Sequence, residues 1–457
     1  MTAKLLIRSI TMNTKTLRQK ILDLAIHGKL VAQDPDDEPA SELLKRIKAE
    51  KEEQIKEGKI KKSKKTKTTS DTPKSENPPF EIPSSWEWTT LGEIFKFCQG
   101  VQVDKGKQIY NHQQGYVRFL RIIDYTQNTE PPRYIIDPGQ KYHIKSNDLV
   151  MIRYGSPGIP CRGYEGVIAN NLFQIIPCYK PSIDLSFAFY FFSSVYYQSL
   201  CQSKGVALKA ISFTTINKIS FPLPPLAEQK RIVSEIERWF ALIDQIEQSK
   251  ATLQATIAQA KKKILDLAIH GKLVAQDPDD EPASELLKRI NPQAEQMYEE
   301  ELPKGWSGCN FEQMFNQISS KPYQILQSQI KSTGLYPVVS QSSNFIEGYS
   351  NETNVFKNDH SVVIFGDHTR NVKFIDFDFI VGADGVKILK PIFDPKYSYY
   401  FVLYASLHIQ DKGYSRHFGQ ILKFHYLLPP LAEQKRIVKK IEELFGVLDT
   451  IQQALGE

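Results

Sequence analysis

Two short motifs in this sequence contain residue types that could act on nucleic acids. N-P-P-F at 77–80 has the pattern with which amino-methyltransferases hold a target amine, but no glycine-rich strand–helix turn precedes it. P-D at 35–36 with E-G-K at 57–59 imitates a nuclease metal site, yet its carboxylates fall in a turn and a lysine-rich linker and not on paired strands. With no P-loop and no Cys/His cluster, we predict neither a catalytic residue nor a metal ligand in this chain.

The elements that must position any functional side chain include one long predicted helix. From Leu226 to His270, apolar residues recur with four-three spacing, which is typical of a helix that buries a narrow seam against another helix. Pro224 and Pro225 favour its start, and Gly271 favours its end. At roughly 1.5 Å per residue the helix would be about 68 Å long, and such a helix needs a partner.

The same chain contains that partner, because both parts of the helical segment are repeated. The residues LPPLAEQKRIV at 223–233 recur at 428–438, and the 28 residues of 20–47 recur unchanged at 263–290. The two ends of the chain together therefore rebuild one copy of the central element, as in a two-unit repeat closed into a circle. We predict that the following residues form the helix seam and dock partners: Ile232, Ile236, Trp239, Ile243, Ile246, Leu253, Ile257, Ile437, Ile441, Leu444, Leu448 and Ile451.

The repeats divide the chain into alternating helical and mixed segments. Residues 79–222 contain short β-branched and aromatic runs, followed by an aromatic stretch at 184–202 that we expect to be one buried helix, and 302–427 repeat this plan with little identity. The full division is 1–47 (N-terminal half of the helical region), 48–78 (lysine-rich linker), 79–222 (first mixed domain), 223–290 (central helical region), 291–301 (linker), 302–427 (second mixed domain) and 428–457 (C-terminal helix).

Composition limits the cellular setting. Hydrophobic residues make up 41% and charged residues 24% of the 457, with a formal net charge of +6, which is only a weak pointer to polyanions. No apolar run is long enough to span a membrane. The five cysteines are scattered and never in C-x-x-C spacing, which favours a reducing cytoplasm over disulfides or zinc.

The doubled PPLAEQKRIV, the doubled IHGKLVAQDPDDEPASELL and the P-x-x-W entry to each mixed domain closely resemble one family, the specificity (S) subunits of type I restriction–modification enzymes. The resemblance covers essentially the whole chain. It implies an α+β fold, with two mixed α/β target recognition domains separated by a pair of long antiparallel helices (a coiled coil) in a pseudo-two-fold circular repeat. The linker departs from the family pattern, because it follows the first helical copy and is nearly absent after the second.

The resemblance also implies a non-catalytic, DNA-binding subunit. Each recognition domain would read one half of a bipartite site in double-stranded DNA, and the helices would dock two methylation (M) subunits of an adenine-specific methyltransferase complex, to which restriction (R) subunits are recruited. We expect no cofactor in this chain; S-adenosylmethionine, ATP and Mg²⁺ are expected in the partner subunits. The alternative is a coiled-coil scaffold whose mixed domains bind proteins and not DNA.

Candidate DNA-binding residues lie in corresponding loops of the two domains. Arg, Asn and Gln can pair with base edges in the major groove, whereas Lys and Ser mostly reach phosphates. In the first domain the candidates are Lys105, Lys107, Arg153, Ser156, Asn170, Asn171 and Lys209. In the second domain they are Lys321, Tyr323, His368, Arg370, Asn371, Arg416, His417 and Gln420.

Overall fold

The computed structural model describes residues 13–57, 78–179, 183–203, 206–207, 210–290, 302–382, 384–413 and 415–456. The chain divides into an N-terminal unit, Met12–Gln248, and a C-terminal unit that comprises Ser249–Glu457 and Met1–Thr11. The linker at 291–301, Asn77 of the N-P-P-F motif and Lys209 lie outside the described residues. Within those residues every helix is too short or too polar to cross a membrane.

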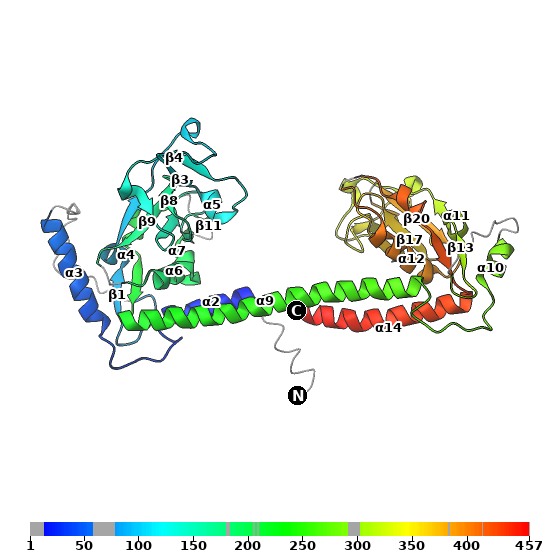
Figure 1. Cartoon of the computed structure of the whole chain (residues 1–457), viewed down its shortest axis with the longest axis horizontal. Coiled ribbons are helices and arrows are strands. Elements are labelled where there is room, and N and C mark those ends of the chain that lie inside the picture. Colours follow the sequence, from blue (N-terminus) through cyan, green and yellow to red (C-terminus); the bar gives the residue numbers. More distant parts are fainter. Residues whose placement is uncertain are drawn as a thin grey trace. The chain divides into compact units, whose positions relative to one another are not determined.

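The N-terminal unit is a mixed α/β domain held on two helices (Figure 1). Its helices are α2 (Thr14–Ile26), α3 (Ala40–Lys56), α4 (Leu91–Ile94), α5 (Ile122–Thr126), α6 (Leu185–Ser193), α7 (Val195–Leu200), α8 (Phe213–Ile216), the 3₁₀ turns η1 (Lys105–Lys107) and η2 (Gln140–Tyr142), and the first part of α9 (Leu226–Ile269). Its strands are β1 (Glu87–Thr90), β2 (Phe95–Gln99), β3 (Tyr116–Leu120), β4 (Arg133–Ile136), β5 (His143–Ile144), β6 (Leu149–Ile152), β7 (Pro160–Cys161), β8 (Gly166–Ile168), β9 (Leu172–Pro177), β10 (Gln202–Ser203), β11 (Val206–Ala207) and β12 (Ser220–Leu223).

The C-terminal unit repeats this plan (Figure 1). Its helices are the rest of α9, then α10 (Ala283–Ile290), α11 (Phe311–Met314), η3 (Lys321–Tyr323), η4 (Gln327–Gln329), α12 (Pro395–His408), α13 (Phe418–Ile421) and α14 (Leu431–Gly456). Its strands are β13 (Ser307–Cys309), β14 (Phe315–Ile318), β15 (Tyr336–Val339), β16 (Gly348–Ser350), β17 (Val362–Gly366), β18 (Val372–Ile375), β19 (Ile380–Val381), β20 (Val386–Pro391) and β21 (Tyr426–Leu428).

Three sheets of one unit correspond to three sheets of the other. The four-stranded sheet β2-β9-β6-β7 matches β14-β20-β17-β18, and in both every neighbouring pair is antiparallel. The second sheet, β4-β3-β8-β5 or β16-β15-β19, contains one parallel pair in each unit, β3–β8 or β15–β19. A two-stranded ribbon, β1–β12 or β13–β21, leads into α9 or α14. The predicted duplication of the mixed domain is therefore confirmed.

Each unit contains an antiparallel pair of helices, as the repeats predict. In the N-terminal unit α2 lies beside the start of α9, and Arg18 Nη2 contacts Asp244 Oδ1 at 2.6 Å. In the C-terminal unit α14 lies beside the rest of α9, and Lys261 forms an ion pair with Asp449 at the corresponding place. The predicted helix Leu226–His270 agrees with α9 to one residue. Gly271 follows it with φ +66°, and Lys272 N–H bonds to the Leu267 carbonyl, which closes the helix.

The predicted seam is only partly buried, and this is a correction. Ile232, Ile236, Ile243, Ile257, Ile437 and Ile441 are buried, and Leu444 and Leu448 are half-buried, but Trp239, Ile246, Leu253 and Ile451 are exposed. At Trp239 the reason is that α9 packs against the domain helix α6 as well as α2, so that Phe240 faces inward in its place. The Phe240 ring lies 5.8 Å from Tyr190 of α6, and Phe445 lies 5.9 Å from Tyr400 of α12 in the other unit.

One predicted element also differs from the structure. The aromatic stretch at 184–202 is not one helix, because Ser194 is extended between α6 and α7 and its hydroxyl caps Tyr197 N–H. The linker predicted from residue 48 is helical at first, in agreement with the expectation for its start: α3 continues to Lys56, and its Lys51 Nζ donates to the Gly92 carbonyl at 2.7 Å. The remainder of that linker, 58–77, lies outside the described residues.

Candidate nucleic-acid interface

Each mixed domain is fastened to its helix by a buried glutamate of the repeated LAEQKR sequence. In the N-terminal unit, Glu228 accepts hydrogen bonds from Trp86 Nε1–H (2.9 Å) and Gln33 Nε2–H (2.6 Å). Burial raises the pKa of the Glu228 carboxyl, and these two bonds oppose the rise. In the C-terminal unit Glu433 accepts from Trp306 Nε1–H at 3.1 Å. The tryptophan of P-x-x-W is therefore an anchor for the whole domain.

The next residues of the same repeat complete the attachment. Gln229 accepts the Asp184 N–H at the start of α6, and Gln434 accepts the Asp394 N–H at the start of α12. Arg231 pairs with Asp37 through both guanidinium nitrogens, and Arg436 pairs with Asp280 in the same way. The repeated sequences thus supply closely similar attachments to two domains that otherwise differ. Sequence reasoning identified the repeats but missed this role.

In the first domain the structure gathers several predicted residues at one end of the sheet β2-β9-β6-β7. Arg153 N–H donates to the Asn171 carbonyl at 2.9 Å, so the loops after β6 and before β9 adjoin. Asn170 Nδ2 donates to Gln102 Oε1 at 3.2 Å, which ties these loops to the segment that continues into η1. Lys105, Lys107 and Ser156 are exposed.

The Arg153 side chain is partly committed to packing. Its guanidinium lies 4.9 Å from the centre of the Phe213 ring and 5.0 Å from that of Tyr154. Tyr154 itself is exposed, and sequence reasoning missed it. An exposed aromatic ring beside an arginine can stack on a base, and the Arg-Tyr dipeptide directly after a buried strand is the signal that could have identified it.

The second domain uses the same loop framework with different side chains. Asp367 occupies the place of Arg153: its N–H donates to the Gly385 carbonyl (2.7 Å) and its carbonyl accepts His417 N–H (2.8 Å). Its carboxylate accepts Phe418 N–H at 2.8 Å. Lys321 and Arg416 are exposed, while Tyr323 is half-buried with its ring against Phe356. The equivalent loops thus present a cation in one domain and a buried carboxylate in the other.

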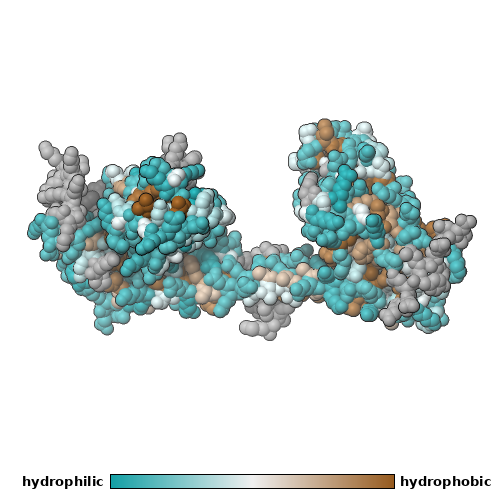
Figure 2. Space-filling view, turned by 45° about the horizontal axis from the view of Figure 1, so that its top comes forward, coloured by the Kyte–Doolittle hydropathy of each residue, from teal (hydrophilic) through white to brown (hydrophobic). Residues whose placement is uncertain are grey.

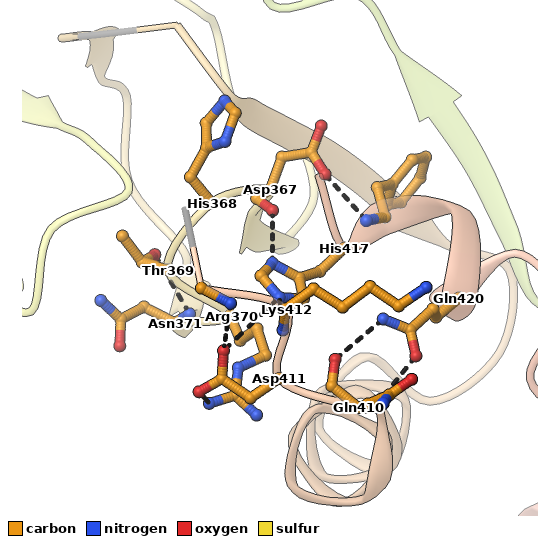
Figure 3. A network of polar contacts seen from close by, with 12 residues as sticks. Asp367, His368, Thr369, Arg370, Asn371, Gln410, Asp411, Lys412, His417 and Gln420 are labelled. Carbon is orange, nitrogen blue, oxygen red and sulfur yellow. Dashed lines mark hydrogen bonds and ion pairs between the residues drawn. The ribbon is translucent and has the colours of Figure 1, made fainter. Parts of the chain in front are cut away.

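Figure 3 shows the network that joins the predicted residues of the second domain. Gln341, which follows β15, was not predicted from the sequence. It holds the β17–β18 loop against the end of β15, because its carbonyl accepts hydrogen bonds from Thr369 Oγ1 (2.6 Å) and Asn371 Nδ2 (3.0 Å). Its Oε1 accepts the half-buried His368 N–H at 3.1 Å. Gln420 exchanges two hydrogen bonds with the Gln410 backbone. The Asn371 and Gln420 amides therefore already hold loops in place.

His417 needs a different assignment from the predicted DNA contact. The residue is fully buried. Its Nδ1 contacts the Asp367 carbonyl at 3.0 Å, and its Nε2 accepts Lys412 N–H at 3.1 Å. Because Nε2 accepts a backbone N–H, we assign a ring proton to Nδ1, which then donates to the Asp367 carbonyl. The ring is enclosed and has no free nitrogen for a base, so its role is to hold the loops.

The part of the chain that the structure describes offers no metal site. It contains no group of three His, Cys, Asp or Glu side chains that could hold a metal ion. The surface seen in Figure 2 is mostly hydrophilic, with small apolar patches on both units.

Comparison with known proteins gives the family. The family model for the type I restriction modification DNA specificity domain matches residues 83–255 and 303–456. The chain is 30% identical over 368 residues to the type I restriction enzyme EcoEI specificity subunit of Escherichia coli, covering 65% of this chain and 61% of that protein. It is 28% identical to the EcoAI specificity subunit of Escherichia coli, covering 74% of this chain and 68% of that protein.

Among solved structures, the fold resembles a chain from a study of complex assembly and conformational transition of the type I R-M system. The TM-score is 0.55 with 17% identity, and the match covers 83% of this chain and 94% of that one. The family model alone covers most of the sequence and matches it twice, once over each mixed domain and the helix that follows it. The chain therefore belongs to the family of type I restriction modification DNA specificity domains.

Proposed function

We propose that this chain is the specificity subunit of a type I restriction–modification complex and reads a bipartite site in double-stranded DNA. Each recognition domain would read one half of the site with the loops at the end of its four-stranded sheet. The supporting observation is that the two domains are attached to their helices in the same way but have different side chains in the equivalent loops. The attachments through Glu228 and Glu433 are alike, whereas the equivalent loop positions differ, with Arg153 in one domain and Asp367 in the other. This is the pattern expected of two readers with different half-sites.

Charge supports a reader that does not bind DNA indiscriminately. Residues 80–222 contain 14 Lys and Arg against 10 Asp and Glu, and residues 302–428 contain 12 against 10. Such small excesses neutralise few phosphates, so base contacts and partner subunits must add affinity. Of the predicted contacts, the exposed Lys105, Lys107, Lys321 and Arg416 are free to reach phosphates or bases.

The exposed apolar side chains of α9 support docking of a partner. Trp239, Leu242 and Ile246 are all more than one-third exposed, and they recur with the three- and four-residue spacing of one helix face. We propose that two methylation subunits pack helices here and that restriction subunits join the assembly. S-adenosylmethionine, ATP and Mg²⁺ would be bound by those partners, with this chain contributing no catalytic group. The free thiols of its five cysteines suit the cytoplasm.

Selection of bound DNA from a random duplex pool, with the full chain and its methylation subunit, tests this function. We expect enrichment of a split motif with a fixed spacer. Lys107→Ala should weaken binding to all sequences about equally, since a lysine contacts phosphates, while Lys20→Ala on α2 removes the same charge without effect. No enrichment with the partner present would reject DNA reading and leave the protein-binding scaffold.

A further inference from the structure

Arg370 and Asp411 face each other from two different loops of the second domain (Figure 3). Arg370 lies in the turn between β17 and β18, and Asp411 lies in the segment between α12 and α13. Arg370 Nη2 donates to Asp411 Oδ2 at 2.6 Å. Asp411 was not among the predicted contact residues.

Both partners of this ion pair are held in place by their own loops. Asp411 Oδ1 accepts Gly413 N–H at 2.9 Å, and the adjacent Lys412 N–H is bonded to the buried His417 ring. Arg370 N–H donates to the Gly366 carbonyl at 2.8 Å, and the Asn371 carbonyl accepts Gly366 N–H at 2.9 Å. The geometry of the pair is therefore set before any ligand arrives.

The backbone of Arg370 has a strained conformation in this turn. Its φ is +59°, a left-handed conformation that glycine or asparagine adopts more readily than arginine. The ion pair offers little stability in return, because Asp411 is 60% exposed and water screens it. Strain that contributes little to folding is typical of functional positions. The pair is thus better explained by a ligand than by stability.

The donors that remain on Arg370 indicate the ligand. Within the described residues, Asp411 Oδ2 accepts one Nη2–H and engages no other side-chain donor of Arg370, so one edge of the guanidinium keeps its two parallel N–H groups for another acceptor. Two adjacent guanidinium donors match the O6 and N7 acceptors that guanine presents in the major groove. A phosphate is a poorer match, because the Asp411 carboxylate beside it would repel the negative charge.

We propose that Arg370 reads a guanine in the half-site of the second domain and that Asp411 is its positioning residue. The inference rests on the proposed function and makes it more specific. Asp411 fixes the direction of the guanidinium and excludes phosphates, so that Arg370 contributes to sequence discrimination and not to general affinity.

The test is the base profile selected from a random duplex pool by the full chain with its methylation subunit. Arg370→Lys and Asp411→Asn should each reduce the preference for G at one position of one half-site by about tenfold, because a bidentate pair supplies discrimination of that order. Asp411→Asn should also bind random DNA more tightly. The other half-site should be unchanged.

Asp378→Asn is the matched control. Asp378 also pairs with an exposed cation, Lys357 (2.7 Å), and also accepts a backbone N–H, from Asn358, but it lies beyond the opposite end of the β17–β18 hairpin. The base profile selected by the Asp378→Asn variant should equal that of the wild type. If the wild type selects a split motif and neither Arg370→Lys nor Asp411→Asn alters a single position, the guanine assignment is wrong. If Arg370→Lys reduces the preference for G and Asp411→Asn does not, Asp411 is not a positioning residue. If the wild type selects no motif, the proposed function itself is rejected.

Discussion

At the scale of single residues, burial separates the side chains that hold this fold from those that can bind a ligand. Glu228, Trp86 and His417 are polar groups inside the protein, and each finds partners there because an unpaired buried polar group costs folding energy. Lys107 and Arg416 remain exposed. Exposure therefore makes Lys107 and Arg416 better candidates for a ligand contact than the buried His417.

Trp86→Phe should destabilise the N-terminal unit in a pH-dependent way. The substitution removes the Nε1–H bond to Glu228 and raises further a pKa that burial already raises. At pH values above the pKa of the Glu228 carboxyl in the folded state, the free energy of unfolding should fall by about 1–3 kcal/mol. The loss should shrink as the pH falls below the carboxyl's pKa in the folded state, because the protonated acid depends less on a donor. Urea unfolding at several pH values measures this.

Trp88→Phe is the control for this prediction. Among the described residues, the buried Trp88 Nε1–H has no acceptor, so its removal should cost no hydrogen bond at any pH. Equal, pH-independent losses in the two variants would contradict the anchoring role of Glu228.

At the scale of elements, the sequence predicts helices better than it predicts their contacts. The ends of α9 follow from Pro224, Pro225 and Gly271, which act locally. The inward position of Phe240 in place of Trp239 depends on α6, a helix more than forty residues away in sequence, so heptad spacing could not reveal it. The same limit applies to the reading loops, because only the three-dimensional contacts show that His417 is enclosed.

Substitutions at two neighbouring isoleucines of α9 should affect different properties, one the stability of the fold and the other the binding of a partner. Ile243 is 1% exposed and Ile246 is 56% exposed. Ile243→Gln buries a polar amide and should lower the free energy of unfolding by about 2–4 kcal/mol. Ile246→Gln should change it by less than about 0.5 kcal/mol, yet weaken binding of the methylation subunit as measured by calorimetry. Full partner affinity in Ile246→Gln would argue against docking on this face.

At the scale of the whole molecule, the chain is a duplicated design with one shared element. The N-terminal and C-terminal units have matching sheets, matching anchors and matching ion pairs between antiparallel helices, and α9 runs through the division between them. Duplication of the attachments with divergence of the loops lets the loops of each domain change without disturbing the scaffold. If a continuous helix links two readers, its length sets the spacer between the half-sites.

Lengthening the helices tests that relation. One heptad inserted after Ser249 and one after Gln453 keep the apolar faces in phase and add about 10 Å at 1.5 Å per residue. The preferred spacer should grow by about three base pairs, at 3.4 Å each, while both half-sites stay the same. Selection from a random duplex pool measures spacer and half-sites together. A heptad after Gln453 alone, which leaves α9 unchanged, should not produce the longer spacer, and altered half-sites in the double insertion would refute the separation of reading from spacing.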